Sequence, residues 1–370
     1  RNAPWVGTHN SFNSIAEMGP TLSDTDANQQ LSLTDLLRVD IRSLELDLHW
    51  FPSVYQPLIA PVVCHAESLH EGCSIEKPLA PVLTNIAAWL RAHRDQVLLL
   101  YLEDHLTAGV GNGDAHGKAV SALTAQLGSA IYRPAGGGCT KLPLDLTRNQ
   151  VLASGAQVVL VSGCGTTAGW RSLVFDWNAH VEERPKGYQD YPSCGPNFTR
   201  AVYDSNLVRY YEDSTWLTTA GSVIGQSSID DGIPPATAAA MTRCGVDLTG
   251  FDQLRPDDGR LEASIWSWGK DEPRPTGDDC AIERGDGRFE TRPCTESHPA
   301  ACRAASGAWT ITATPTAFGD AAAACAGAGT SLAVPRTGYE NQLLKAAAAA
   351  ATPWLGYVRD GAGWRALDSR

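Results

Sequence analysis

Six side chains that can transfer protons or bind a cation follow or end short apolar segments in the first third of the chain. They are His9, Asn10, Glu45, Asp47, His65 and Glu103. Histidine transfers protons near neutral pH, and carboxylate and amide oxygens are ligands for a hard cation such as Ca²⁺ or Mg²⁺. Each residue taken singly has an ordinary structural explanation. Together they predict an acid–base site beside a cation.

The segment 41–50 positions two of these carboxylates. Its leucines alternate with Ser43, Glu45, Asp47 and His49, so the two sets face opposite ways in a strand. A buried parallel strand is normally apolar on both faces, and unpaired carboxylates are costly to bury. The segment is therefore either a solvent-exposed antiparallel strand or a barrel strand whose inward face ends in a cation site.

The remaining elements alternate between strands and helices. Segments 61–66 and 96–105 are apolar strands that lead to His65 and to Glu103-Asp104-His105. Further strands are predicted at 157–162, 172–176, 207–211 and 245–249, and helices at 32–39, 78–94, 115–131 and 234–243. This order predicts a parallel α/β arrangement with close to eight strands, a (β/α)8 TIM-type barrel. Active sites in such barrels lie at the carboxyl ends of the strands, where all six residues fall.

Composition narrows the class of protein. The chain has 370 residues, of which 43% are hydrophobic, and a formal net charge of -12. This length predicts about two domains, and the negative charge argues against nucleic acid and against docking on anionic lipid. No apolar run approaches the ~18 residues of a membrane span. The chain starts at Arg1 without Met or an apolar leader, which favours a mature or trimmed product.

The ten cysteines indicate the compartment. None forms a Cys-x-x-Cys, so zinc and thioredoxin-like interpretations are disfavoured, and disulfides in a secreted protein fit best. Proximity in sequence predicts four pairs: Cys64–Cys73, Cys139–Cys164, Cys194–Cys244 and Cys280–Cys294.

The motifs Thr8-His9-Asn10, Leu44-Glu45-Leu46-Asp47, Cys64-His65 and Leu102-Glu103-Asp104-His105 resemble, in order and rough spacing, the X-region of phosphatidylinositol-specific phospholipase C. The calcium-dependent branch is most similar. The metal-independent bacterial branch typically has Asp after the first histidine and an Arg where calcium would sit. The resemblance covers roughly residues 1–255. It implies catalytic His9 and His65, and Ca²⁺ bound by Asn10, Glu45, Asp47 and Glu103.

A shorter match concerns the substrate. Leu207-Val208-Arg209-Tyr210-Tyr211 is similar to the family's Arg-x-Tyr strand, which implies that Arg209 and Tyr211 bind the phosphate and the inositol ring. The lysines that hold phosphorylated inositol rings in eukaryotic members have no clear counterpart. An inositol phospholipid or a soluble inositol phosphodiester is therefore the expected substrate, with transient membrane contact and a monomeric enzyme.

From about Asp257 the sequence resembles a C-type-lectin-like domain, with its halves in reversed order. We therefore divide the chain into a phosphodiesterase barrel, 1–256, and an α+β lectin-like domain, 257–370. Half-domains in reversed order imply a circular permutation, which requires termini that lie close together. The alternative is two truncated copies, each without a complete core.

Three further expectations follow from the lectin-like resemblance. It implies a Cys302–Cys325 disulfide. The sugar-binding triplets stand as Glu272-Pro273-Arg274 and Phe289-Glu290-Thr291, which lack the usual cation donors, so no calcium-dependent sugar site is expected. The strand at 363–367 should lie beside a strand at 263–268. Four tryptophans, at positions 266, 268, 354 and 364, should then form one cluster.

The predicted function is that of a secreted Ca²⁺-dependent phosphodiesterase of the phospholipase C type, in which a substrate hydroxyl attacks phosphorus. His9 acts on the nucleophile side and His65 protonates the leaving group, and Glu45 is an alternative base. Two other functions stay open. One is a glycerophosphodiester-type metal hydrolase that uses water, and the other is a non-catalytic secreted adhesin.

Overall fold

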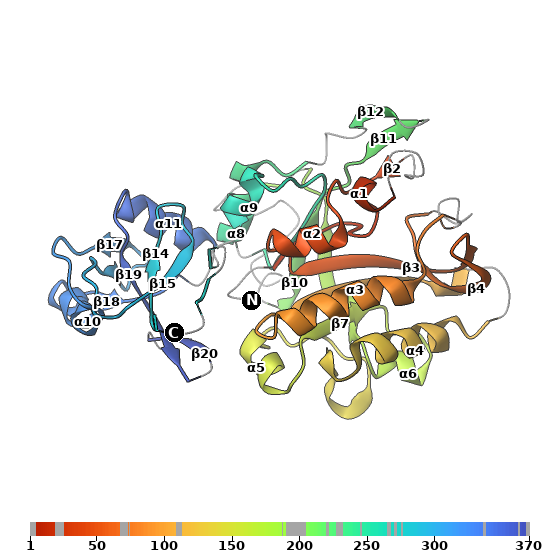
Figure 1. Cartoon of the computed structure of the whole chain (residues 1–370), viewed down its shortest axis with the longest axis horizontal. Helices are drawn as coiled ribbons and strands as arrows, with labels where there is room; N and C mark the ends of the chain where they lie inside the picture. Colours follow the sequence, from red (N-terminus) through yellow and green to blue (C-terminus); the bar gives the residue numbers. More distant parts are fainter. Residues whose placement is uncertain are drawn as a thin grey trace. The chain divides into compact units, whose positions relative to one another are not determined.

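The structure is a computed structural model. It describes residues 5–18, 26–66, 73, 75–108, 113–186, 188–189, 205–219, 222–226, 232–244, 246–264, 268–269, 272–274, 277–335, 338–361 and 363–367. The chain forms two compact units, one of 5–233 with 246–258 and the other of 234–245 with 259–370 (Figure 1). No described helix has both the length and the apolar character to cross a bilayer.

The first unit is built on a parallel sheet whose strands are neighbours in chain order. They are β1 (Trp5–Thr8), β3 (Ser43–Ser53), β5 (Leu98–His105), β7 (Val158–Ser162), β8 (Phe175–Asp176), β9 (His180–Glu183), β10 (Leu207–Tyr211) and β13 (Leu248–Phe251). β1 pairs with both β3 and β13, so the sheet curls, and β6 (Ile131–Tyr132) adds to β7. Within the described residues no pairing joins β8 to β9. The α/β class is confirmed, and the fully closed barrel stays a prediction.

The segment that leads to His65 does not form a parallel barrel strand. It forms β4 (Gln56–Val63), which runs antiparallel to β3 as the second arm of a hairpin. β3 continues past its parallel partners to Ser53, and the chain then turns back. A short apolar strand looks the same in either direction, so the sequence pattern could not distinguish the two. His65 therefore follows the second arm of a hairpin.

Helices cover one face of this sheet, where α2, α3, α4 and α6 pack each on the next (Figure 1). The described helices of the unit are α1 (Ile15–Met18), α2 (Leu33–Arg38), α3 (Leu79–Ala92), α4 (Ala115–Leu127), α5 (Arg148–Ala153) and α6 (Ala168–Arg171). Ser32 caps α2 by accepting a hydrogen bond from Asp35 N, and Thr147 and Gln150 form a capping box on α5. The fully buried leucines of β3 face this helical layer.

The other face of the sheet is the interior, and its character changes along the strands. Near the strand starts it is apolar, with Leu99, Val159, Val161 and Leu248 in one buried cluster. Towards the carboxyl ends it becomes charged. The register aligns Tyr101 with Glu45 and places Glu103 level with Asp47. The apolar layer closes the interior below, so the polar groups gather at one end.

A small antiparallel sheet lies at the edge of the first unit. It consists of β2 (Asp26–Ala27), β11 (Trp216–Thr219) and β12 (Ser222–Gln226). The residues directly after β2 enter the site described below.

The described residues of the second unit form two sheets. One has the order β15 (Phe289–Arg292), β14 (Cys280–Glu283), β19 (Trp354–Asp360), β20 (Gly363–Ala366), and the other has the order β17 (Trp309–Ile311), β16 (Ala301–Arg303), β18 (Ser331–Leu332). Its helices are α8 (Pro235–Cys244), α9 (Gly259–Ser264), α10 (Phe318–Gly327) and α11 (Gly338–Ala348). Because β14 pairs with β19, strands from both halves share one sheet.

The predicted strand pairing within this unit is wrong. Residues 259–264 are helix α9, and β20 pairs with β19 instead. Trp268 does meet Trp364, with ring centroids 4.7 Å apart, but Trp354 packs in a different cluster. Trp266 lies outside the described residues. The lectin-like architecture and the permutation stay predictions.

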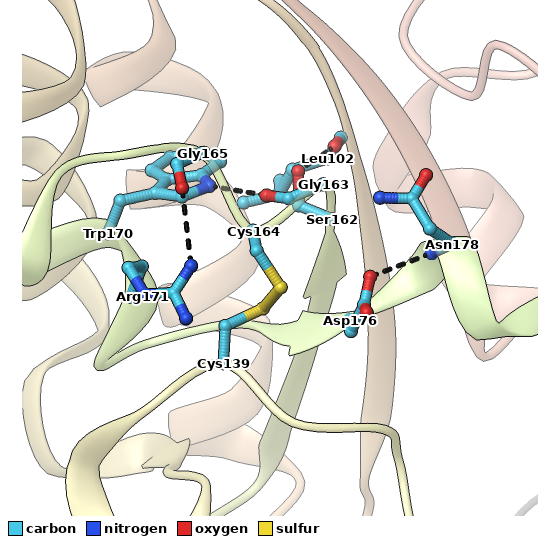
Figure 2. Close-up of a disulfide and its surroundings, with 10 residues drawn as sticks. All are labelled: Leu102, Cys139, Ser162, Gly163, Cys164, Gly165, Trp170, Arg171, Asp176 and Asn178. Atoms are coloured by element: carbon cyan, nitrogen blue, oxygen red, sulfur yellow. Dashed lines mark hydrogen bonds between the residues drawn. A yellow bond between two sulfur atoms is a disulfide. The ribbon is translucent and has the colours of Figure 1, made fainter.

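Four predicted disulfides are confirmed: Cys64–Cys73, Cys139–Cys164, Cys280–Cys294 and Cys302–Cys325. Cys244 is also disulfide-bonded, and its predicted partner Cys194 lies outside the described residues. Figure 2 shows how Cys139–Cys164 fastens a loop to the segment directly after β7, where Trp170 Nε1 donates to Gly163 O over 2.9 Å. This disulfide fixes the chain just beyond a strand's carboxyl end.

Candidate active site

Three carboxylates converge at the carboxyl end of the curled sheet. Glu45 and Asp47 stand two residues apart on β3, and Glu103 lies on the neighbouring strand β5 opposite Asp47. One oxygen from each lies within 4.8 Å of the others. Two residues per repeat put Glu45 and Asp47 on one face of the strand, and the register adds Glu103. Of the two alternatives for this segment, the structure has the strand that lies parallel to its neighbours and carries a buried polar face.

The His9-Asn10 turn is held against these carboxylates by the main chain. β1 ends at Thr8, and Asn10 takes a left-handed backbone with φ 42°, which Asn tolerates better than most residues. Ser11 N donates to Glu45 O (3.1 Å), and Ser11 Oγ accepts from Glu45 N (2.9 Å). Gly7 permits the approach, because a Cβ there would lie 2.8 Å from Ser43. Asn10 is thereby fixed next to β3.

The carboxylates disturb one another's ionisation. Burial, together with the charges of Glu103 and Glu45, raises the pKa of Asp47 well above its usual range. Burial also raises the pKa of Glu45, although Arg209 opposes it. Burial acts in the same direction on Glu103, but the hydrogen bond and charge of His105 outweigh it and lower the pKa of Glu103. Among the three carboxylates, Asp47 is therefore the one whose negative charge is least compensated, since Arg209 offsets only part of the effect of its neighbours.

Arg209 balances two other carboxylates. Its guanidinium hydrogen-bonds both Glu45 and Glu182, which lies beside it on β9. Burial opposes ionisation of Glu182, but Arg209 and His180 prevail and lower the pKa of Glu182 to about 2. Gly250 leaves room for this arrangement, because a Cβ there would lie 3.1 Å from the Arg209 guanidinium. Arg209 reaches the site as predicted, where it is engaged by carboxylates.

His9 is oriented by an aspartate. Its Nδ1 lies 3.3 Å from Asp252 Oδ2, which leaves Nε2 to meet a substrate. Burial disfavours the charged ring, but Asp252 and Glu45 outweigh burial and raise the pKa of His9. The Tyr211 ring lies 5.1 Å from the His9 ring, so the predicted tyrosine is also at the site.

The orientation of the Asn10 amide follows from its neighbour Asn28. Asn28 Nδ2 donates to Asp252 Oδ2 (3.2 Å), and Asn28 Oδ1 accepts from Asn13 Nδ2 (2.9 Å), so both ends of the Asn28 amide are determined. Asn28 Oδ1 then also accepts from Asn10 Nδ2 (3.1 Å).

The consequence is that Asn10 Oδ1 faces the Asp47 carboxylate, with the closest approach at 2.9 Å. Turning the Asn10 amide would let it donate to Asp47, but would place its oxygen against Asn28 Oδ1. Two acceptors that face each other repel unless a cation or a proton lies between them. The amide oxygen and three carboxylates therefore form an all-oxygen donor set that fits Ca²⁺.

His65 lies two residues after the end of β4 and is half-buried. The preceding residue, Cys64, donates its main-chain N–H to the main-chain oxygen of Asp47 (3.1 Å). Within the described part of the chain no hydrogen bond or ion pair fixes the His65 imidazole, in contrast to His9.

Asp104 and His105 have separate surroundings. Asp104 caps the 3-10 turn η1 (Leu106–Ala108) through Leu106 N and bonds His116 Nε2 at 2.8 Å. His105 Nε2 lies 3.4 Å from Glu103, and its ring stacks on His49 at 4.7 Å. Asp104 is therefore a helix-start residue.

Four residues of the site were not predicted from the sequence: Asn28, Gln29, Glu182 and Asp252. Gln29 Nε2 joins His9 O (2.6 Å) to Asp252 Oδ1 (2.9 Å), which fixes the His9 turn against β13. Asp252 follows the carboxyl end of a strand, as the predicted residues do, and that signal could have identified it. The others lie on segments of two to four residues, which carry no periodic pattern.

Comparisons with known proteins identify the family of the first unit. The family model described as "Rv2075c PI-PLC-like domain" matches residues 1–258. The chain belongs to this family, and its fold supports a phosphodiesterase-type hydrolase. Two relatives from Mycobacterium tuberculosis, "Uncharacterized protein MT2135" of strain CDC 1551 / Oshkosh and "Uncharacterized protein Rv2075c" of strain ATCC 25618 / H37Rv, are each 44% identical over 378 residues. Each match covers 97% of this chain and 76% of the relative.

A solved structure is also similar. It is the phosphatidylinositol-specific phospholipase C from Listeria monocytogenes, at 13% identity and a TM-score of 0.40, with 71% of this chain and 93% of that chain covered.

Proposed function

We propose that the chain is a secreted, Ca²⁺-dependent phosphodiesterase that cleaves phosphatidylinositol or a related inositol phosphodiester by attack of a substrate hydroxyl on phosphorus. The family supports phosphodiester chemistry, and the disulfides support export, since such bonds persist in oxidising compartments. One observation supports calcium above all. The Asn28 network turns Asn10 Oδ1 towards Asp47, beside two further carboxylates.

The charges of the site support the same choice. Arg209 forms ion pairs with Glu45 and Glu182, and His105 forms one with Glu103. Asp47 has no such ion pair among the described residues, and the more distant charge of Arg209 offsets only part of the repulsion from Glu45 and Glu103. Without a cation this repulsion favours the protonated form of the Asp47 carboxyl, which is the direction of its pKa shift. Asn10, Glu45, Asp47 and Glu103 are the residues that would hold the ion. Bound Ca²⁺ would lower the pKa of the attacking hydroxyl and stabilise charge on the phosphoryl oxygens.

The two histidines have different roles. His9, with a raised pKa and an Asp252 partner, is suited to bond a phosphoryl oxygen or to manage the nucleophile's proton through Nε2. His65, which no described contact holds, is free to follow and protonate the leaving alcohol. Tyr211 packs beside His9 and offers a ring face to the inositol.

The second unit is proposed as a lectin-like module without a calcium-dependent sugar site. Arg274 lies among acidic side chains, 3.0 Å from Asp278, 3.2 Å from Glu272 and 3.6 Å from Glu290. Its guanidinium supplies the positive charge that a cation would bring to these carboxylates.

Phosphorus NMR of phosphatidylinositol incubated with the protein tests the proposed phosphodiesterase activity and its dependence on calcium. We expect a new inositol phosphate signal with calcium and none with EDTA. Full conversion in EDTA would show that Asp47 is neutralised without a metal. Conversion of glycerophosphodiesters alone would favour the water-using hydrolase, and no conversion of either substrate would favour a non-catalytic adhesin.

Variants of His9 and His65 test the catalytic roles proposed for these two residues. His9→Ala and His65→Ala should each reduce turnover by roughly 10²–10⁴-fold, the usual worth of proton transfer. A substrate with an acidic leaving alcohol should rescue His65→Ala but not His9→Ala. Equal losses on both substrates would remove His65 from the leaving-group role.

A further inference from the structure

The β3–β4 hairpin ends in a group of exposed apolar side chains. Val54 is 72% exposed, Tyr55 56%, Leu58 77% and Ile59 37%. Six large apolar side chains are exposed in the described part of the chain, and four of them are these. We call these four residues the hairpin tip. A cluster at one place differs from the scattered exposure that is normal on a protein surface.

The turn itself does not require these residues. Ser53 pairs with Gln56, so Val54 and Tyr55 form a two-residue connection between the strands. Such connections favour Gly, Asn and Asp, whose backbones suit the turn. A β-branched and an aromatic residue at these two positions bring no advantage to the fold in water. Their apolar character therefore indicates a contact outside the chain.

The hairpin carries no formal charge. From Leu48 to Ala66 the sequence has no Asp, Glu, Lys or Arg, although charged residues make up 19% of the whole chain. This segment offers nothing to pair with a charged protein surface or with anionic lipid headgroups. An uncharged, apolar segment is suited to the hydrocarbon layer of a bilayer whose headgroups carry no net charge.

The hairpin tip is continuous with the active site. Strand β3 carries Glu45 and Asp47 and then runs on to the turn at Val54. At about 3.3 Å per residue, the turn lies up to about 23 Å from Asp47. If the hairpin tip binds a surface, the carboxyl end of the sheet, with Asp47, would therefore lie near that surface.

We propose that the hairpin tip inserts into the surface of an uncharged, zwitterionic phospholipid bilayer and so brings the site to lipid substrates. The choice of a lipid partner rests on the proposed function. A second copy of the chain fits less well, because Pro57 and Pro61 make β4 a poor edge for a further strand. Each copy would also carry a net charge of -12.

Vesicle flotation tests the proposal without using turnover, so failure of the proposed reaction would not affect the result. The full chain is mixed with phosphatidylcholine vesicles at low and at high salt. We expect the wild type to float with the vesicles at both salt concentrations. The double variant Val54→Ser/Leu58→Ser should bind roughly tenfold or more weakly, because two exposed apolar groups are lost.

Leu343→Ser is the matched control, since Leu343 is exposed at 36% but lies on α11. It should float like the wild type. Hydrolysis of a soluble inositol phosphodiester should be unchanged in the double variant, which shows that the fold and the site are intact. Three results would overturn the proposal: no flotation of the wild type, binding only at low salt with anionic vesicles, or a wild-type dimer that the double variant converts to a monomer.

Discussion

Asn28 Oδ1 accepts a hydrogen bond from Asn10 Nδ2 over 3.1 Å, and this bond decides which atom of Asn10 meets Asp47. Asn28 is fully buried, and its own amide is fixed by Asp252 and Asn13. A residue that contacts none of the three carboxylates in the described hydrogen bonds therefore sets the donor that is offered to a cation.

Two substitutions of Asn28 separate this role from simple packing. Asn28→Leu removes the acceptor, so Asn10 can turn and donate to Asp47, and calcium affinity should fall by roughly tenfold, the worth of about one hydrogen bond. Asn28→Asp keeps an acceptor for Asn10, although it replaces the donor near Asp252 and His9 with a carboxylate oxygen. It should therefore bind calcium more tightly than Asn28→Leu. Isothermal titration with Ca²⁺ measures both. Equal losses in the two variants would contradict the role given to Asn28.

Asp47→Asn should separate stability from calcium binding. Removing one of three crowded carboxylates relieves repulsion, so the calcium-free variant should melt at a higher temperature than the wild type, by roughly 2–4 °C for each kcal/mol gained. Saturating calcium stabilises the wild type by about 2.7 kcal/mol at 100 times Kd, and this shift should disappear in the variant. Thermal denaturation with EDTA and with calcium gives both values. An unchanged calcium shift would remove Asp47 from the ligand set.

Asp252→Asn should lower turnover less than His9→Ala and should also move the pH profile. Asp252 raises the pKa of His9, so its neutral replacement lowers that pKa. The limb of the pH–rate profile that reports His9 should therefore move to lower pH. A variant that loses activity without any movement of the profile would show that Asp252 only supports the fold.

The burial of Glu283 on β14 predicts that the stability of the second unit depends on pH. Glu283 is 1% exposed, and both carboxylate oxygens lack a hydrogen-bond partner among the described residues. Burial raises its pKa to about 8, and Lys345 only partly opposes this. The protonated form is favoured in the folded state, so its contribution is complete below about pH 4.5 and is lost as the pH rises to about 8. Over that window stability should fall by up to about 1.4 kcal/mol per pH unit.

Chemical denaturation of the Glu283→Gln variant between pH 5 and pH 8 checks this. The variant should be more stable than the wild type at pH 8 and should show a flatter dependence on pH. Asp320→Asn, which changes an exposed carboxylate on α10, should follow the wild type. The same slope in wild type and Glu283→Gln would mean that Glu283 is not buried as a neutral acid.

The sequence located Glu45, Asp47 and Glu103 because period-two alternation and strand ends determine where side chains point. It did not locate Asn28 or Glu182, because each lies on or beside a strand of two to four residues and reaches the site only through tertiary packing. The sequence also did not show whether β4 runs parallel or antiparallel to its neighbour, because its apolar pattern is compatible with either direction. The segment around Trp268 alternates as a strand does, but its first residues are helix α9.

The charge balance at Asp47 bears on where and when the protein would be active. Arg209 is a permanent part of the chain, whereas the counter-charge for Asp47 is exchangeable under the proposed chemistry. A newly made chain in a calcium-poor, reducing interior would lack both the ion and its disulfides. Under the proposed calcium dependence and export, it would thus be inactive towards the lipids of the cell that makes it, and would become active only in surroundings that supply calcium and oxidise its cysteines.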